Sequence, residues 1–299
     1  MRKTRFKTLL AAALALLAAN GLHAQADTVS QSRPQQALEE LQANSVDAVN
    51  PADPTRFTTR ATLYGAGFTN VFDTYLSPQE YRGVEFRVSR ESMRITRWMD
   101  GRVSLQTLFQ AHVGYTHNRV DNNKTFSGLA NWNYGLHYHF RLTDNFRLLA
   151  GGVGDFNGGF VWNLRNGNNP ASARAYANLD ASGMAIWDLR VRNRLVTLRY
   201  QANLPLLGVM FSPHYGQSYY EIFSLGNAGG VVRFTSLHNQ PSLRQMLTAD
   251  FPVGRVRMRL AYVCDIQQSA LNKIKTHTYS HVFMVGFVKE LYRLHPKNR

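Results

Sequence analysis

The chain has 299 residues, of which 44% are hydrophobic and 18% charged, and its mean hydropathy is −0.30. This polar composition excludes a bundle of membrane-spanning helices, and the length suits two average domains or one large all-β barrel. The formal net charge is +15, but the basic residues are interspersed with apolar ones instead of forming clusters, which argues against nucleic acid as a partner.

The N-terminal segment has the three parts of a secretory signal peptide. Four basic residues lie within the first seven, an apolar run spans Thr8–Leu22, and Ala24-Gln25-Ala26 offers cleavage after residue 24 or 26. We therefore predict a signal peptide over 1–26, whose removal would lower the net charge from +15 to about +11. Such an export signal is a further argument against nucleic acid. Residues 27–56 are polar and are predicted to form a short periplasmic segment or a plug.

From residue 57 onward, apolar and polar residues alternate. The clearest stretch is Asn131–Leu142, where every second residue is apolar or aromatic and the others are Asn, Gly, His or Arg. Successive side chains of a strand point to opposite faces. A barrel in lipid needs an apolar outside and a polar lumen. We therefore predict an all-β fold, a single antiparallel transmembrane β-barrel over 57–299, in the outer membrane of a Gram-negative bacterium. The alternative is a soluble periplasmic β-protein.

Turn signals divide this region into about 12 strands, with a range of 10–14. The predicted spans include separate strands at 218–226, 229–239 and 241–252. Connections alternate between short and long, as in barrels that keep both chain ends in the periplasm. The short ones are Met99–Gly101, Thr143–Asp144, Arg192–Asn193, Asn227–Ala228 and Pro252–Gly254, and the long ones are Asp73–Tyr81, Asn118–Lys124, Arg165–Pro170, Pro205–Gln217 and Gln267–Lys275.

Polar residues on the inward face of these strands are the main candidates for a functional site. They predict either an interlocking network that fills a narrow barrel or the lining of a channel, and their basic excess favours small anionic solutes. The single cysteine, Cys264, allows no intramolecular disulfide, and no His or Cys cluster has metal-ligand spacing, so we expect neither metal nor cofactor. The candidate lumen residues are Asn131, Asn133, His137, His139, Arg141, Asp180, Asp188, Arg190, Arg199, Arg255, Arg257 and Arg259.

A glycine-rich run, Gly151–Gly159, is followed by turn signals at Arg165–Ala171 and by an alternating stretch at Ala173–Leu179. Together these segments resemble an uncharacterised family of outer-membrane barrels from Bacteroidota, a domain of unknown function. The resemblance covers the chain from about Phe57 and implies a barrel and an outer-membrane address, without an activity or site residues. The glycines themselves predict a bent strand or a close backbone approach at the entry to an outer loop, with ligand contacts by Asp155 or Asn157 as the alternative.

An enzyme is the second class to consider, because outer-membrane phospholipase A is a barrel of similar size. Its signature places His and Ser two residues apart on a strand, so that the base can reach the nucleophile. The full signature, in which Asn-Gly follows this pair, is absent. The nearest pieces are His214 with Ser218, four residues apart, and the adjacent Ser280 and His281, which point to opposite faces of a strand.

We therefore expect a non-enzymatic barrel, either a narrow pore or a structural and accessory barrel with a polar, basic lumen. The alternative is a membrane-embedded hydrolase or acyltransferase that acts on lipid. Expected partners are outer-membrane lipid and lipopolysaccharide, with a small anionic solute or a protein partner in addition.

Overall fold

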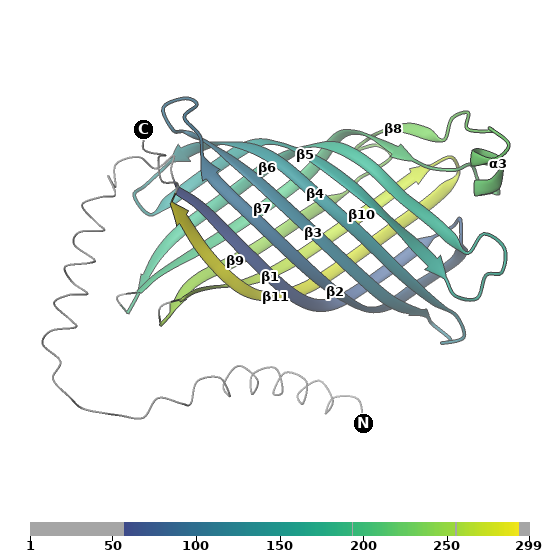
Figure 1. The fold of residues 1–299 in the computed structure, drawn as a ribbon, viewed down its shortest axis with the longest axis horizontal. Coiled ribbons are helices and arrows are strands. Elements are labelled where there is room, and N and C mark those ends of the chain that lie inside the picture. The colour runs from purple at the N-terminus through teal and green to yellow at the C-terminus, as the bar shows by residue number, and fades with distance from the viewer. Residues whose placement is uncertain (1–56, 193, 255, 293–299) are drawn as a thin grey trace, which may run out of the picture. The chain divides into compact units, whose positions relative to one another are not determined.

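A computed structural model describes residues 57–192, 194–254 and 256–292, all within one compact unit (Figure 1). The predicted signal peptide and the polar segment 27–56 lie outside the described residues. Most of the described chain is strand, as predicted. The elements in chain order are β1 (Phe57–Asp73), β2 (Ser77–Ile95), β3 (Val103–Asn118), β4 (Lys124–Arg141), β5 (Phe146–Asn163), β6 (Ala171–Val191), β7 (Arg194–Phe211), α3 (Tyr219–Phe223), β8 (Val232–Ser236), β9 (Leu243–Val253), β10 (Val256–Leu271) and β11 (Ile274–Tyr292).

The strands form one antiparallel sheet that closes on itself. Neighbours follow the chain order from β1 to β7 and continue through β9, β10 and β11, and β11 pairs back with β1. Ten of the eleven described strands make this ring, whereas β8 pairs only with β7. Each ring strand thus has a hydrogen-bonded partner on both sides, which is the arrangement that a spanning sheet needs in lipid. The predicted closed antiparallel barrel is confirmed.

The predicted number of twelve strands is wrong, and the first reason lies at 218–226. This span holds the helix α3 in place of a strand. The Ser218 hydroxyl accepts from the backbone N–H of Glu221 (3.2 Å), and the Glu221 carboxylate accepts from the backbone N–H of Ser218 (2.7 Å). This capping box satisfies the first N–H groups of a helix, although the aromatic residues that follow have strand propensity.

The second reason lies at 229–239 and 241–252, which do not form two neighbouring strands. β8 and β9 pair one after the other along the same side of β7, separated by the excursion 237–242. They therefore occupy one position in the barrel wall. The predicted short turn Asn227–Ala228 lies in the connection between β7 and β8, at the end opposite to the one predicted.

The two ends of the barrel differ. Figure 1 shows that β1 begins and β11 finishes at one end, whereas α3 and β8 lie at the other. Two connections at the α3 end are shorter than predicted, spanning only 74–76 and 272–273. The backbone N–H of Thr74 donates to the Lys275 carbonyl (3.1 Å), which joins the start of β11 to the turn that follows β1. At the end where β1 begins and β11 finishes, the connection 142–145 is tight, as predicted, and β6 ends at Val191 shortly before β7 begins at Arg194.

The outer surface is apolar and the interior polar, the inverse of a soluble protein. Val282 is fully buried while its neighbour Phe283 is 71% exposed, and this alternation recurs on every ring strand. Among the described residues, buried polar side chains outnumber buried apolar ones. No helix in the described part of the chain is long and apolar enough to cross a membrane.

The glycine-rich run lies inside β5, which leads into the connection 164–170. A Cβ added at Gly151 would stand 1.8 Å from the carbonyl oxygen of Leu136 on β4, whereas a Cβ at Gly158 would meet nothing within 4 Å. The predicted close backbone approach therefore explains glycine at position 151. β5 continues to Asn163 and then enters the loop 164–170 at the α3 end, as predicted.

Candidate functional site

The interior of the barrel is filled by two clusters of ionised side chains, and Arg87 lies in the first. Arg87 is fully buried on the inward face of β2. Its Nε donates to Glu85 (2.8 Å), and its Nη1 donates to Gln110 (3.1 Å) and to Asp265 of β10 (3.2 Å). A buried guanidinium is tolerated only when its charge is balanced, and here Glu85 and Asp265 balance it while Gln110 accepts a further hydrogen bond.

Arg244 of β9 extends the first cluster to the opposite wall. Its Nε lies 3.3 Å from the Asp265 carboxylate. Its Nη1 reaches Asn131 of β4 (2.9 Å) and Asp155 of β5 (3.3 Å). Asp155 is thus held by a buried arginine and by neighbouring amides, so its contacts are internal.

The second cluster surrounds Glu91 of β2. Arg199 donates to Glu91 from β7 (2.7 Å), and Arg259 of β10 forms a further ion pair with the same carboxylate. Arg259 also holds Asp250 through two bonds (2.5 and 2.6 Å), and Gln106 donates to Glu91 (2.6 Å). β2 and β7 lie five positions apart in a ring of ten, so this contact crosses the whole lumen.

The charge of this interior is not the basic one expected for the lumen. The buried charged groups among the described residues are seven carboxylates and four arginines. Each of these arginines has at least one carboxylate partner. Exposed arginines instead lie near the strand ends, among them Arg141 and Arg190.

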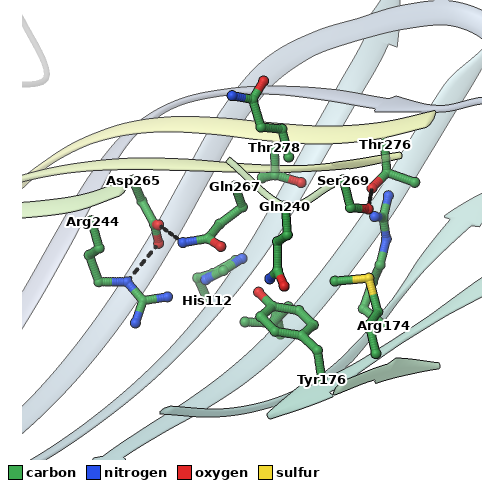
Figure 2. A pocket seen from close by; sticks show the side chains of 13 residues that line it. His112, Arg174, Tyr176, Gln240, Arg244, Asp265, Gln267, Ser269, Thr276 and Thr278 are labelled. Carbon is green, nitrogen blue, oxygen red and sulfur yellow. Dashed lines mark hydrogen bonds and ion pairs between the residues drawn. The ribbon is translucent and has the colours of Figure 1, made fainter. Parts of the chain in front are cut away.

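A small polar pocket lies above the first cluster, towards the α3 end (Figure 2). Its volume is about 40 Å³, which holds only a few water molecules. Asp265 and Arg244 contribute to its lining, and Gln267 donates to Asp265 (2.7 Å). Gln240 comes from the excursion between β8 and β9, is buried, and points toward Tyr176 in Figure 2. The Gln240 side-chain oxygen has no hydrogen-bond partner among the described residues.

Aromatic residues close the wall beside this pocket at the α3 end. Tyr219 stacks on Phe211 and Phe223, and its hydroxyl accepts from the backbone N–H of Ala173 (2.6 Å). Burial, reinforced by the neighbouring Tyr219, raises the pKa of Tyr75 to about 12. Its hydroxyl therefore stays protonated and donates to the Gln217 carbonyl (2.8 Å), which anchors the segment before α3.

The structure places the predicted lumen residues at different depths. Six are buried in the interior and take part in or adjoin the two clusters: Asn131, Asn133, His137, Asp180, Arg199 and Arg259. Three are half-buried, namely His139, Asp188 and Arg257, and two are exposed, Arg141 and Arg190. Arg255 lies outside the described residues.

Several central residues were not among the predicted ones: Glu85, Arg87, Glu91, Arg244, Asp250 and Asp265. A signal for three of them exists in β2, where Glu85, Arg87 and Glu91 alternate with apolar residues. From the sequence alone, these charged residues are easily assigned to a solvent-exposed face. Only the closed barrel shows that this face points into the interior. The segment 237–242, which carries Gln240 into the interior, is not a strand, so its sequence shows no alternation that would predict this position.

The weak catalytic pair does not come together as a nucleophile and base. The His214 ring bonds the Gly229 carbonyl (3.2 Å), while the Ser218 hydroxyl belongs to the helix cap of α3. A close Ser–His contact does occur inside the barrel, between Ser182 and His137 (2.9 Å). Both residues are buried, so this contact belongs to the interior network. Among the described residues, no three His, Cys, Asp or Glu side chains form a group that could hold a metal ion.

Comparison with solved structures finds bacterial barrels with low similarity. The transport unit of the autotransporter AIDA-I from Escherichia coli has 10% identity and a TM-score of 0.46, over 88% of this chain and 100% of that one. The beta domain of the Bordetella autotransporter BrkA has 9% identity and a TM-score of 0.41, over 80% and 100%. The translocator domain of autotransporter NalP from Neisseria meningitidis has 10% identity and a TM-score of 0.40, over 87% and 98%.

No curated protein matches the sequence. A family described as "Protein of unknown function (DUF3316)" matches residues 9–298, nearly the full length of the chain. The sequence-based expectation of an uncharacterised family is confirmed by this match. The chain therefore belongs to the DUF3316 family.

Proposed function

We propose that this protein is an outer-membrane β-barrel of a Gram-negative bacterium, and that it works as a structural or accessory barrel with a lumen closed by its own side chains. The outward belt of apolar and aromatic residues supports membrane insertion, because such a surface exposed to water would be costly. An origin in the Bacteroidota, suggested by the resemblance, stays a prediction.

The observation that carries the closed-lumen proposal is the contact of Glu91 with Arg199 across the ring. A second crossing, from Arg244 to Asn131, lies closer to the α3 end. A water-filled channel would have to pass both, and the side chains that form them are buried. Breaking the first would leave the Arg199 guanidinium without a carboxylate partner in a poorly hydrated interior, so thermal opening is opposed.

The interior pocket of about 40 Å³ supports the closed lumen, because ligand sites for molecules of drug size occupy about 300–1,000 Å³. Hollows of about 400–750 Å³ lie elsewhere on the barrel, so pocket size argues only against a ligand bound at this interior position. His214 and Ser218 do not form a pair that could activate a nucleophile toward lipid.

The test is electrical recording from the mature chain in planar bilayers, with insertion checked separately by flotation with phospholipid vesicles. We expect the protein to float with the vesicles and to give no conductance steps. A steady, ion-selective current from inserted protein would overturn the closed-lumen proposal and make a narrow pore the leading function. Arg257→Glu would then report whether that pore prefers anions.

The proposed partners are lipid and lipopolysaccharide around the barrel. A small anionic solute or a protein partner is a further proposal, to which the α3 end is the natural approach because the small pocket lies there. Protein pull-down from the native membrane, with the wild-type chain as bait, tests the partner: no specific association with the inserted barrel would contradict it.

A further inference from the structure

On three adjacent strands, β11, β1 and β2, the outward residues change from apolar to basic at the same height of the barrel. The outward residues of β1 are Phe68 and Tyr64 and then Arg60, while those of β11 are Phe283 to Phe287 and then Lys289. On β2, outward Val84 and Phe86 give way to Arg90 and Arg94. The change falls toward the end where β1 begins and β11 finishes (Figure 1).

The pairing register brings these cations together. Arg60 stands directly opposite Lys289 on β11 and directly opposite Ser92 on β2. Arg90 and Arg94 flank Ser92 two residues to either side, so both are diagonal neighbours of Arg60 on the same face. All four cations are exposed. We call Arg60, Arg90, Arg94 and Lys289 the basic patch.

No carboxylate of the described residues forms an ion pair with any member of the basic patch. The acidic residues at this end of β2 and β11 lie on the inward face: Glu91 pairs with Arg199 and Arg259, and Glu290 pairs with Arg257 (2.7 Å). Like charges that face each other across paired strands repel. Because no carboxylate of the described chain offsets this repulsion, an anion from outside the chain would stabilise the four cations.

The position of the basic patch limits what that anion can be. The basic patch directly adjoins the apolar belt. Arg90 pairs with Phe109 of β3. Thr62, the next outward residue after Arg60 on β1, pairs with Phe287 of β11. A ligand that reaches both surfaces must have an anionic group next to a hydrocarbon body. A phospholipid meets this requirement, and guanidinium groups bind phosphate through paired hydrogen bonds.

We propose that the basic patch binds the phosphate of an anionic phospholipid in the leaflet on the side where β1 begins and β11 ends. The inference rests on the proposed membrane location. The lipid places its headgroup over Arg60 and Lys289 and its acyl chains along the aromatic belt. It thereby neutralises the patch and fixes the depth of the barrel in that leaflet.

Native mass spectrometry of the mature chain in detergent, titrated with phosphatidylglycerol or with phosphatidylcholine of the same acyl chains, tests the proposal. The wild type should bind phosphatidylglycerol more tightly. The patch variant, with Gln at 60, 90, 94 and 289, should lose roughly tenfold or more of that affinity, because each surface cation contributes about fivefold. A variant with Lys at 60, 90 and 94 keeps the charge and should retain most of it.

The matched control removes the same charge elsewhere at the same end. Arg97, Arg141, Arg190 and Arg192 are exposed and outside the patch, and their replacement by Gln should change the affinity by less than about twofold. Equal losses in both variants would overturn the proposal in favour of nonspecific attraction. A wild type that binds phosphatidylglycerol and phosphatidylcholine equally would overturn it as well.

The failure of this inference is distinguishable from that of the proposed function. A chain that does not float with vesicles contradicts the membrane barrel itself. A chain that inserts but binds both phospholipids equally contradicts only the lipid site. Because all four residues are exposed on strand surfaces, the substitutions leave the buried clusters intact, and the shift of the folded band in unheated gels confirms this for each variant.

Discussion

Arg87 shows how a barrel can keep ionised groups without water around them. Its guanidinium contacts Glu85, Gln110 and Asp265, and each of these is itself held by the fold. The Arg87→Met substitution removes the cation and leaves two buried carboxylates with fewer partners. We expect it to destabilise the barrel by about 3–5 kcal/mol, measured by urea unfolding in vesicles.

The control for that measurement is Arg119→Met, which removes an exposed cation in the connection between β3 and β4. It should change the free energy of unfolding by less than about 0.5 kcal/mol. A similar small change for Arg87→Met would mean that water reaches the first cluster, which would contradict the closed lumen.

Gly151 offers a second prediction at the residue scale. In Gly151→Ala the new methyl carbon would start 1.8 Å from the Leu136 carbonyl oxygen, so β4 and β5 must separate locally. We expect a loss of at least about 2 kcal/mol in unfolding free energy. Gly158→Ala on the same strand meets open space and should be nearly neutral. Equal effects of the two changes would contradict the close approach at Gly151.

Residue-level prediction from sequence succeeded where a strand alternates cleanly. The pattern in β4 correctly assigned Asn131, Asn133 and His137 to the interior. It failed at strand ends, where Arg141 and Arg190 keep the inward periodicity but extend past the buried clusters and are exposed. It could not find Arg244 as a hub, because the partners of this residue lie on β4, β5 and β10, and only the closed ring brings them together.

At the scale of elements, α3 explains the main error in strand number. An aromatic run is compatible with a strand, but Ser218 and Glu221 satisfy each other's backbone N–H groups and begin a helix. Ser218→Ala should destabilise α3 by about 1 kcal/mol. Hydrogen exchange should then become faster at Ile222 and Ser224, whose amides donate within this segment, and remain unchanged in β7.

The same substitution tests the lipid-acting alternative. If Ser218 is a cap and not a nucleophile, lipid release by Ser218→Ala and by the wild type should be the same in a vesicle hydrolysis assay. Activity in the wild type that disappears in Ser218→Ala and in His214→Ala would contradict the proposed function.

At the scale of the whole molecule, closure of the sheet determines which residues meet. Alternation and turn signals in the sequence were enough to predict a single antiparallel barrel with both described chain ends at one side. The number of strands in the wall depends on whether β8 and β9 pair with each other as neighbours or follow each other along one strand. In the structure both pair with the same side of β7, so they follow each other. Pairings between distant segments leave no periodicity in the sequence, so the interior clusters could be predicted as polar but not as ion pairs.

The outward apolar belt of the barrel can be tested for contact with lipid by a single charged substitution. Trp132 lies midway along β4, is half exposed, and packs at a tilt against Phe156 on the outer face. In lipid, Trp132→Arg places a charge in hydrocarbon and should cost about 2–4 kcal/mol, seen as a reduced fraction inserted into vesicles. In a soluble β-protein the same change would replace an exposed apolar group with a hydrated one, and folding would be unaffected or improved. Val120→Arg, at an exposed apolar residue in the turn between β3 and β4, should be neutral in either case. Normal insertion of Trp132→Arg beside that control would therefore contradict the membrane barrel, because the belt that defines it would not be facing lipid.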